Sequence, residues 1–165
     1  EIGGLSVDEQ TKIHRANKKN RQYVQLIKDI TPDELLNGSV EFLTEAKKRN
    51  IKTALGSASK NAGLILDGLR IAPLFDVVVD GNCISRAKPD PEVFTYAAKQ
   101  LGVSPVKCIV FEDALAGVQA AHAAGMKCVG IGKSVNLPIA DIICNGLYEL
   151  NQDELPIQLG FTKEV

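Results

Sequence analysis

The sequence has no hydrophobic run long enough to cross a membrane, because no apolar stretch of about 18 residues occurs along its 165 residues. It also lacks a metal-binding or disulfide framework. The histidines do not cluster, no CxxC pair occurs, and the four cysteines are 25, 20 and 16 residues apart: Cys83, Cys108, Cys128 and Cys144. This spacing argues against a zinc site and a disulfide scaffold. A reducing cytoplasm is therefore the expected compartment, and no signal peptide is visible.

Net charge is nearly absent as well. Nineteen lysines and arginines stand against twenty acidic residues, which leaves −1 and argues against nucleic-acid binding through overall charge. The small total hides an asymmetry, since residues 1–28 carry +3 and residues 29–165 carry −4. No acid occurs from Gln10 to Lys28, so this segment is either a solvated basic face or a helix that presents cations to an anionic ligand.

The chain length fits one globular domain with at most a small appendage. Ser6-Val7-Asp8-Glu9 predicts a capping box that opens the basic helix, and Thr31-Pro32 predicts its end. Strands are then expected at 51–55, 76–79, 108–111, 128–131 and 139–143, and helices at 40–46, 64–69, 91–101, 115–124 and 147–155. This alternation predicts an α/β fold with a parallel sheet covered by helices on both faces. Such folds bind ligands beyond the carboxyl ends of the strands.

Three of these strand ends carry polar groups. Ser57-Ala58-Ser59-Lys60-Asn61 offers hydroxyls and helix-terminal amides to a phosphate, although Ser59 as a plain helix cap is the alternative. Lys88 lies in a proline-stiffened loop, which by itself is weak evidence. Glu112 and Asp113 directly follow an apolar strand, where two acids require a neutralising cation, and Mg²⁺ held together with a phosphate suits them. The alternative for this pair is contact with a helix dipole, but the three features together predict a phosphate-transfer site.

These segments resemble the haloacid dehalogenase superfamily of phosphotransferases, and within it the β-phosphoglucomutase group. The resemblance is carried by Ala54 to Asn61, Lys88 to Phe94 and Phe111 to Val118, and it extends over essentially the whole chain. It implies a three-layer, Rossmann-like α/β core at residues 31–165. It also implies that residues 1–30, with the basic helix, are the C-terminal part of a mobile helical cap.

The resemblance further implies an activity and a site. The activity is Mg²⁺-dependent conversion of β-glucose 1-phosphate to glucose 6-phosphate, through a phosphoaspartyl enzyme and glucose 1,6-bisphosphate. The implied site residues are Ser57 and Lys88 at the transferring phosphoryl group, Glu112 and Asp113 at Mg²⁺, Ser59, Lys60 and Asn61 at the second phosphate, and Lys19 at the sugar. Phosphorylated hexoses are the expected partners, without nucleic acid or membrane, and the full-length protein is expected to be a monomer.

The sequence also departs from the family pattern. The family's nucleophile is the first aspartate of an Asp-x-Asp pair, and no such pair occurs here; Ala114 also replaces a common serine. The only methionine is Met126, so we expect an N-terminally truncated sequence that lacks the nucleophile strand, between the strands ending at Gly56 and Glu112. Such a chain would not be a self-sufficient domain. Two other functions stay open: a sugar-phosphate phosphatase of the same superfamily, and a non-catalytic phosphosugar-binding fragment.

Overall fold

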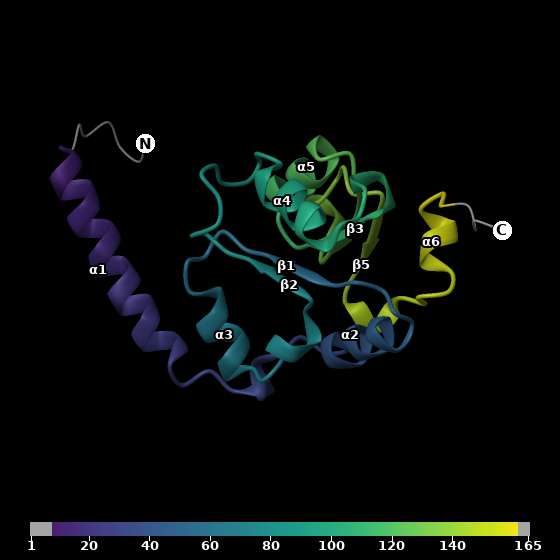
Figure 1. The fold of residues 1–165 in the computed structure, drawn as a ribbon, viewed down its shortest axis with the longest axis horizontal. Helices are drawn as coiled ribbons and strands as arrows, with labels where there is room; N and C mark the ends of the chain where they lie inside the picture. Colours follow the sequence, from purple (N-terminus) through teal and green to yellow (C-terminus); the bar gives the residue numbers. More distant parts are fainter. Residues whose placement is uncertain (1–7, 162–165) are drawn as a thin grey trace.

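The computed structural model describes residues 8–161 and shows helices packed around short parallel strands (Figure 1). The α-helices are α1 (Glu9–Ile27), α2 (Ser39–Lys48), α3 (Ala62–Gly68), α4 (Glu92–Leu101), α5 (Leu115–Ala123) and α6 (Leu155–Gln158). The strands are β1 (Ala54–Gly56), β2 (Val77–Val79), β3 (Ile109–Glu112), β4 (Lys127–Ile131) and β5 (Ile142–Cys144). Short 3₁₀ helices occupy Pro32–Glu34, Ala72–Leu74, Pro105–Lys107, Ser134–Asn136 and Leu147–Glu149.

All strand pairs are parallel, which confirms the predicted α/β class, but the strands form two sheets instead of one. β1 pairs with β2, and β3, β4 and β5 form a second sheet in that order. Within residues 8–161, no strand lies between β1 and β3, so the described strands form two separate parallel sheets. This break falls where the family resemblance places a further strand. That the chain requires another segment there stays a prediction.

The apolar core lies on the two sides of β3 and β4. On one side, α4 and α5 pack against β2 to β4 through fully buried side chains that include Val79, Val93, Val118 and Cys128. On the other side, Val129, Cys144 and the short α6 form a second cluster, to which Phe42 of α2 adds an edge-to-face contact with Phe111, 5.2 Å between ring centres. These clusters hold the carboxyl ends of the strands in place, and the last residues of β2, β3 and β5 are themselves buried.

The helix ends follow the sequence signals in part. As predicted, α4 and α5 stop at Gly102 and Gly125. These glycines adopt left-handed φ angles of 67° and 74°, which other residues rarely adopt. The start of α1 is capped by Asp8, whose carboxylate accepts from the Thr11 amide at 2.8 Å, and Ser6 of the predicted box lies outside the described residues. α1 ends at Ile27, shortly before the predicted break at Thr31-Pro32. α1 stands apart from the sheets at one side of the molecule (Figure 1).

The last predicted helix, at 147–155, is wrong. The chain forms a 3₁₀ turn at Leu147–Glu149 and begins α6 only at Leu155. Pro156 lies in the first turn of α6, where its missing N–H leaves no helical hydrogen bond unmade. No described helix combines the length and the apolar character that a membrane span requires.

Candidate active site

Lys88 connects the carboxyl ends of the two sheets. Its ammonium donates to the carbonyl oxygen of Gly56, the last residue of β1, at 3.2 Å, and to a carboxylate oxygen of Glu112, the last residue of β3. The side chains of Lys88 and Glu112 are only 19% and 9% exposed. The Lys88 ammonium also lies over the Phe94 ring, 4.8 Å from its centre. A buried charge is costly unless it is paired. The ion pair between Lys88 and Glu112 therefore stabilises both charges at the sheet edge.

Gly117 of α5 makes room for the Glu112 carboxylate. A Cβ atom at position 117 would lie 2.1 Å from Cδ of Glu112, a distance that no side chain tolerates. α5 begins at Leu115, two residues after Asp113, and Gly117 in its first turn lies against the carboxylate. The absence of a side chain at Gly117 is therefore a requirement of the site.

Glu112 and Asp113 are the residues that could hold a metal ion. Across residues 8–161, no three His, Cys, Asp or Glu side chains gather into a set that would enclose a metal ion. Mg²⁺ does not require such a set, since it commonly binds one or two carboxylates and completes its shell with water and substrate phosphate. Glu112 is buried and Asp113 is exposed, so the pair offers carboxylate oxygen from the interior and from the solvent side. The donor set fits Mg²⁺ bound together with a phosphate.

The segment Ser57–Asn61 forms a tight loop after β1, which we call the serine loop. The Ser57 amide extends the β1–β2 pairing by donating to Val79 at 2.9 Å. The Ser57 hydroxyl accepts from the Ser59 amide at 3.1 Å, and the Ser59 hydroxyl accepts from the Asn61 amide at 3.2 Å. Ser59 therefore has the cap-like role that the sequence left open as an alternative. Its hydroxyl engages the Asn61 amide, one of the amides expected to bind phosphate. Each hydroxyl accepts in these bonds, so its own hydrogen remains available to donate to an anion.

Gly81 and Asn82, in the loop that follows β2, hold the serine loop through hydrogen bonds. The Gly81 amide donates to Ser59 O at 3.1 Å, and the Asn82 side chain donates to Lys60 O at 3.1 Å. A Cβ atom on Gly81 would lie 2.4 Å from Ala58 O, so only glycine permits this approach. The serine loop is therefore held at the β1 end of the site.

α1 reaches the same region. The Asn61 side-chain amide donates to Asn20 Oδ1 at 2.7 Å, which joins α1 to the serine loop. Lys19 is the preceding residue of α1 and is exposed. The structure therefore brings Ser57, Lys88 and Glu112 to one edge and places the start of α3 beside the part of α1 that carries Lys19.

Cys128 lies behind the site and is not a candidate nucleophile. Burial raises the pKa of this thiol to about 12, and the negative charges of Glu112 and Asp141 add to the rise. The thiolate is the reactive form of cysteine, and a thiol with this pKa stays protonated at neutral pH. Cys128 is a fully buried core side chain.

Several contributors to the site were not assigned from the sequence. They are Asn20, Gly81, Asn82, Glu92, Phe94 and Gly117. Glu92, Phe94 and Gly117 fall inside the segments that carry the family resemblance, so these motifs contained a signal for them. Asn20 and Asn82 carried no such signal, because their contacts join segments that are distant in the chain.

Parallel strands with helices, and with the polar groups gathered at the strand ends, define an α/β protein of the Rossmann-like kind. The model of haloacid dehalogenase-like hydrolases matches residues 4–125. The chain belongs to this family.

Individual relatives agree with this assignment. The chain is 39% identical over 150 residues to β-phosphoglucomutase of Bacillus subtilis, covering 91% of this chain and 65% of that protein. A crystal structure of β-phosphoglucomutase from Clostridium difficile superimposes with a TM-score of 0.89 at 38% identity, covering 94% of this chain and 70% of that one. Fructose-1-phosphate phosphatase YqaB of Escherichia coli is 40% identical over 84 residues, which cover 51% of this chain and 45% of that protein. The chain thus spans less than two thirds of the length of the Bacillus subtilis and Escherichia coli relatives.

Proposed function

We propose that the protein transfers phosphoryl groups on phosphorylated sugars, as a β-phosphoglucomutase that interconverts β-glucose 1-phosphate and glucose 6-phosphate. The observation that carries this proposal is the position of the Lys88 ammonium, between the Glu112 carboxylate and the carbonyl oxygen of Gly56, the residue before Ser57. A cation, a hydroxyl and two carboxylates at one sheet edge are the groups that phosphoryl transfer requires, since its catalysis consists mainly of positioning and electrostatic stabilisation. Similarity to β-phosphoglucomutases supports the choice of reaction.

The proposal assigns a role to each of these residues. Ser57 donates a hydrogen bond to the transferring phosphoryl group, and Lys88 stabilises its negative charge. Glu112 and Asp113 hold Mg²⁺, which supplies further neutralisation of phosphate charge when it is bound. The residues of the serine loop that follow Ala58, namely Ser59, Lys60 and Asn61, bind the phosphate that is not transferred.

The cap and the phosphoryl acceptor complete the proposal. Residues 1–30 form the end of a cap, and Lys19 contacts the sugar when α1 closes over the site and excludes water. The 165 residues contain no Asp-x-Asp pair, so the proposal assigns to this chain the groups around the phosphoryl acceptor and not the acceptor itself. All four cysteines are free thiols, which supports a reducing, cytoplasmic location.

A sugar-phosphate phosphatase is the second candidate, favoured by the similarity to fructose-1-phosphate phosphatase. The two candidates differ in whether a non-transferred phosphate is bound. Lys60→Ala tests this difference, with Lys99→Ala on the exposed side of α4 as the matched control. For the mutase, we expect Lys60→Ala to weaken glucose 1,6-bisphosphate binding about tenfold in calorimetry, and acetyl phosphate binding far less. Equal loss for both ligands would assign Lys60 a structural role and favour the phosphatase.

A further inference from the structure

The loop that carries Lys88 has little regular backbone bonding of its own. It runs from Asp80 to Pro91, between β2 and α4, and we call it the lysine loop. Its internal backbone hydrogen bonds are two turns, Cys83 N to Asp80 O at 3.0 Å and Asp90 N to Ala87 O at 3.1 Å. A segment of this length samples many conformations unless side chains restrict it. The position of the Lys88 ammonium therefore depends on what holds the lysine loop.

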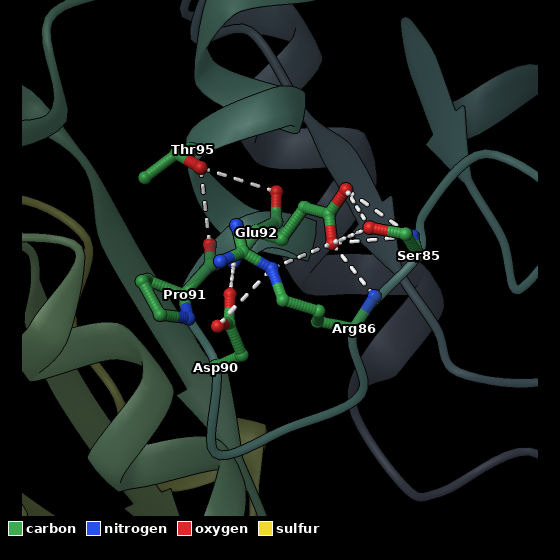
Figure 2. Close-up of polar contacts among 6 residues, drawn as sticks. All are labelled: Ser85, Arg86, Asp90, Pro91, Glu92 and Thr95. Carbon is green, nitrogen blue, oxygen red and sulfur yellow. Dashed lines mark hydrogen bonds and ion pairs between the residues drawn. The ribbon is translucent and has the colours of Figure 1, made fainter.

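Glu92, the first residue of α4, holds it. Its carboxylate accepts from the Ser85 amide at 3.1 Å, from the Ser85 hydroxyl at 3.0 Å and from the Arg86 amide at 2.7 Å. Figure 2 shows the carboxylate directed at Ser85 and at the Arg86 backbone. These bonds close residues 85–92 into a ring, and Lys88 lies within it. Hydrogen bonds from the Ser85 backbone, and then from Arg86, lower the pKa of Glu92, so the carboxylate is charged at neutral pH.

The same helical turn also fixes the other end of the ring. The Glu92 amide donates to Asp90 Oδ1 at 2.9 Å, which ties the residue after Pro89 to the start of α4. Phe94, two residues further along, supplies the ring beneath the Lys88 ammonium. The first turn of α4 thus contacts the lysine loop on both sides of Lys88 and the ammonium itself.

The Arg86 guanidinium is the other group that could hold the loop, and it contributes less. Its Nε lies 3.3 Å from Asp90 Oδ2 and 3.5 Å from Glu92 Oε2, and the side chain is 67% exposed (Figure 2). Exposed ion pairs of this kind are weakened by solvent screening and by the flexibility of the side chain. The Glu92 side chain is 24% exposed, and it bonds to backbone amides whose positions define the loop.

We propose that Glu92 is a positioning residue of the active site: it ties Ser85 and Arg86 to the first turn of α4 and thereby sets the Lys88 ammonium between Gly56 O and the Glu112 carboxylate. The link from this placement to phosphate binding rests on the proposed function, whereas the placement itself does not. The ligand that benefits is the phosphoryl group of a phosphosugar.

The test follows the Lys88 ammonium directly by NMR in protein with isotope-labelled lysine. The Lys88 signals are assigned by their loss in Lys88→Ala, and the Phe94 ring displaces them from those of exposed lysines. Glu92→Ala and Glu92→Gln are expected to remove most of this displacement, and Arg86→Ala little of it. Glu41→Ala is the matched control, because Glu41 is an exposed acid in the first turn of α2. In calorimetry with glucose 6-phosphate, Glu92→Ala is expected to lower affinity about tenfold.

The outcomes separate this inference from the proposed function. Unchanged Lys88 signals in both Glu92 variants would overturn the inference. A similar loss of the displacement in Glu41→Ala would also overturn it, because the effect would then belong to helix ends in general. If the Glu92 variants remove the displacement of the Lys88 signals while Lys88→Ala leaves glucose 6-phosphate binding unchanged, the positioning role stands and the proposed function fails.

Discussion

The two ends of the β3–β5 sheet each carry a cluster of charges, and the clusters differ in how fully they are paired. At the amino ends, both oxygens of Asp141 are occupied: Lys127 donates at 2.8 Å, the Cys128 amide at 2.8 Å, and His122 Nε2 lies 2.9 Å away. At the carboxyl ends, Lys88 is shared between Glu112 and Gly56 O, and Asp113 is exposed.

This difference indicates separate tasks for the two ends. Burial raises the pKa of Asp141, but hydrogen bonds from Lys127, Cys128 and His122 outweigh burial and lower it to about 2. A carboxylate with three partners stabilises the fold and has little capacity for a ligand. The carboxyl-end cluster still holds a cation, hydroxyls and an exposed carboxylate that a phosphate and a metal ion would complete. Substitutions should therefore affect activity at one end and stability at the other.

The largest expected effect is that of Asp113→Asn. Under the proposed function, turnover of β-glucose 1-phosphate should fall about a hundredfold or more, because the proposed Mg²⁺ and the phosphate would lose a carboxylate partner. The urea midpoint should not change, since Asp113 is exposed. Calorimetry should also show that Mg²⁺ no longer strengthens glucose 6-phosphate binding. Full activity in magnesium buffer would exclude Asp113 from the metal site.

Gly117→Ala should give the next largest effect. The new methyl group collides with the Glu112 carboxylate, and we expect a loss of about 2 kcal/mol of unfolding free energy together with weaker phosphate binding. Gly63→Ala is the matched control, because Gly63 is also helical but a Cβ there meets nothing within 4 Å. The control should be neutral or slightly stabilising in urea unfolding. Equal behaviour of the two variants would remove the requirement for glycine at position 117.

Asp141→Asn should lower stability by about 1 to 2 kcal/mol at neutral pH, since the native pKa lies near 2 against a usual value of 3.8. A lowered native pKa contributes stability that is fully present above the usual value and is lost as pH falls from about 4 to about 2. Urea unfolding across that range should show a smaller decline in the variant than in the parent. Phosphosugar affinity should be unchanged, and a large change in affinity would contradict the separation of the two ends.

The smallest expected effect concerns the contact between α1 and the serine loop. Asn20→Ala removes the 2.7 Å hydrogen bond from Asn61, which is exposed, so unfolding free energy should fall by less than about 1 kcal/mol. Hydrogen exchange of the α1 amides should still accelerate, because this bond joins α1 to the core. Asn17→Ala, exposed on the same helix, serves as the control and should leave exchange unchanged. Equal exchange in both variants would show that α1 is held by other contacts.

The sequence by itself determined the order of helices and strands, the α/β class and the strand ends at which polar residues gather. These features depend on local periodicity, on glycine stops such as Gly102, and on the rule that parallel strands end on one edge. Local signals failed at the last helix, which begins only at Leu155 instead of Leu147. How strands pair depends on the segments that lie next to each other, and within residues 8–161 no strand lies between β1 and β3.

Only the tertiary structure decided how the site residues meet. Lys88 and Glu112 are 24 residues apart in the chain, and their pairing follows from the packing of α4 and α5 on the strands. The same packing requires glycine at position 117 and brings Glu92 to the backbone of the lysine loop. Residue types and spacing specify which groups are present, whereas distances and partners arise from burial, which places distant segments side by side and makes an unpaired charge costly.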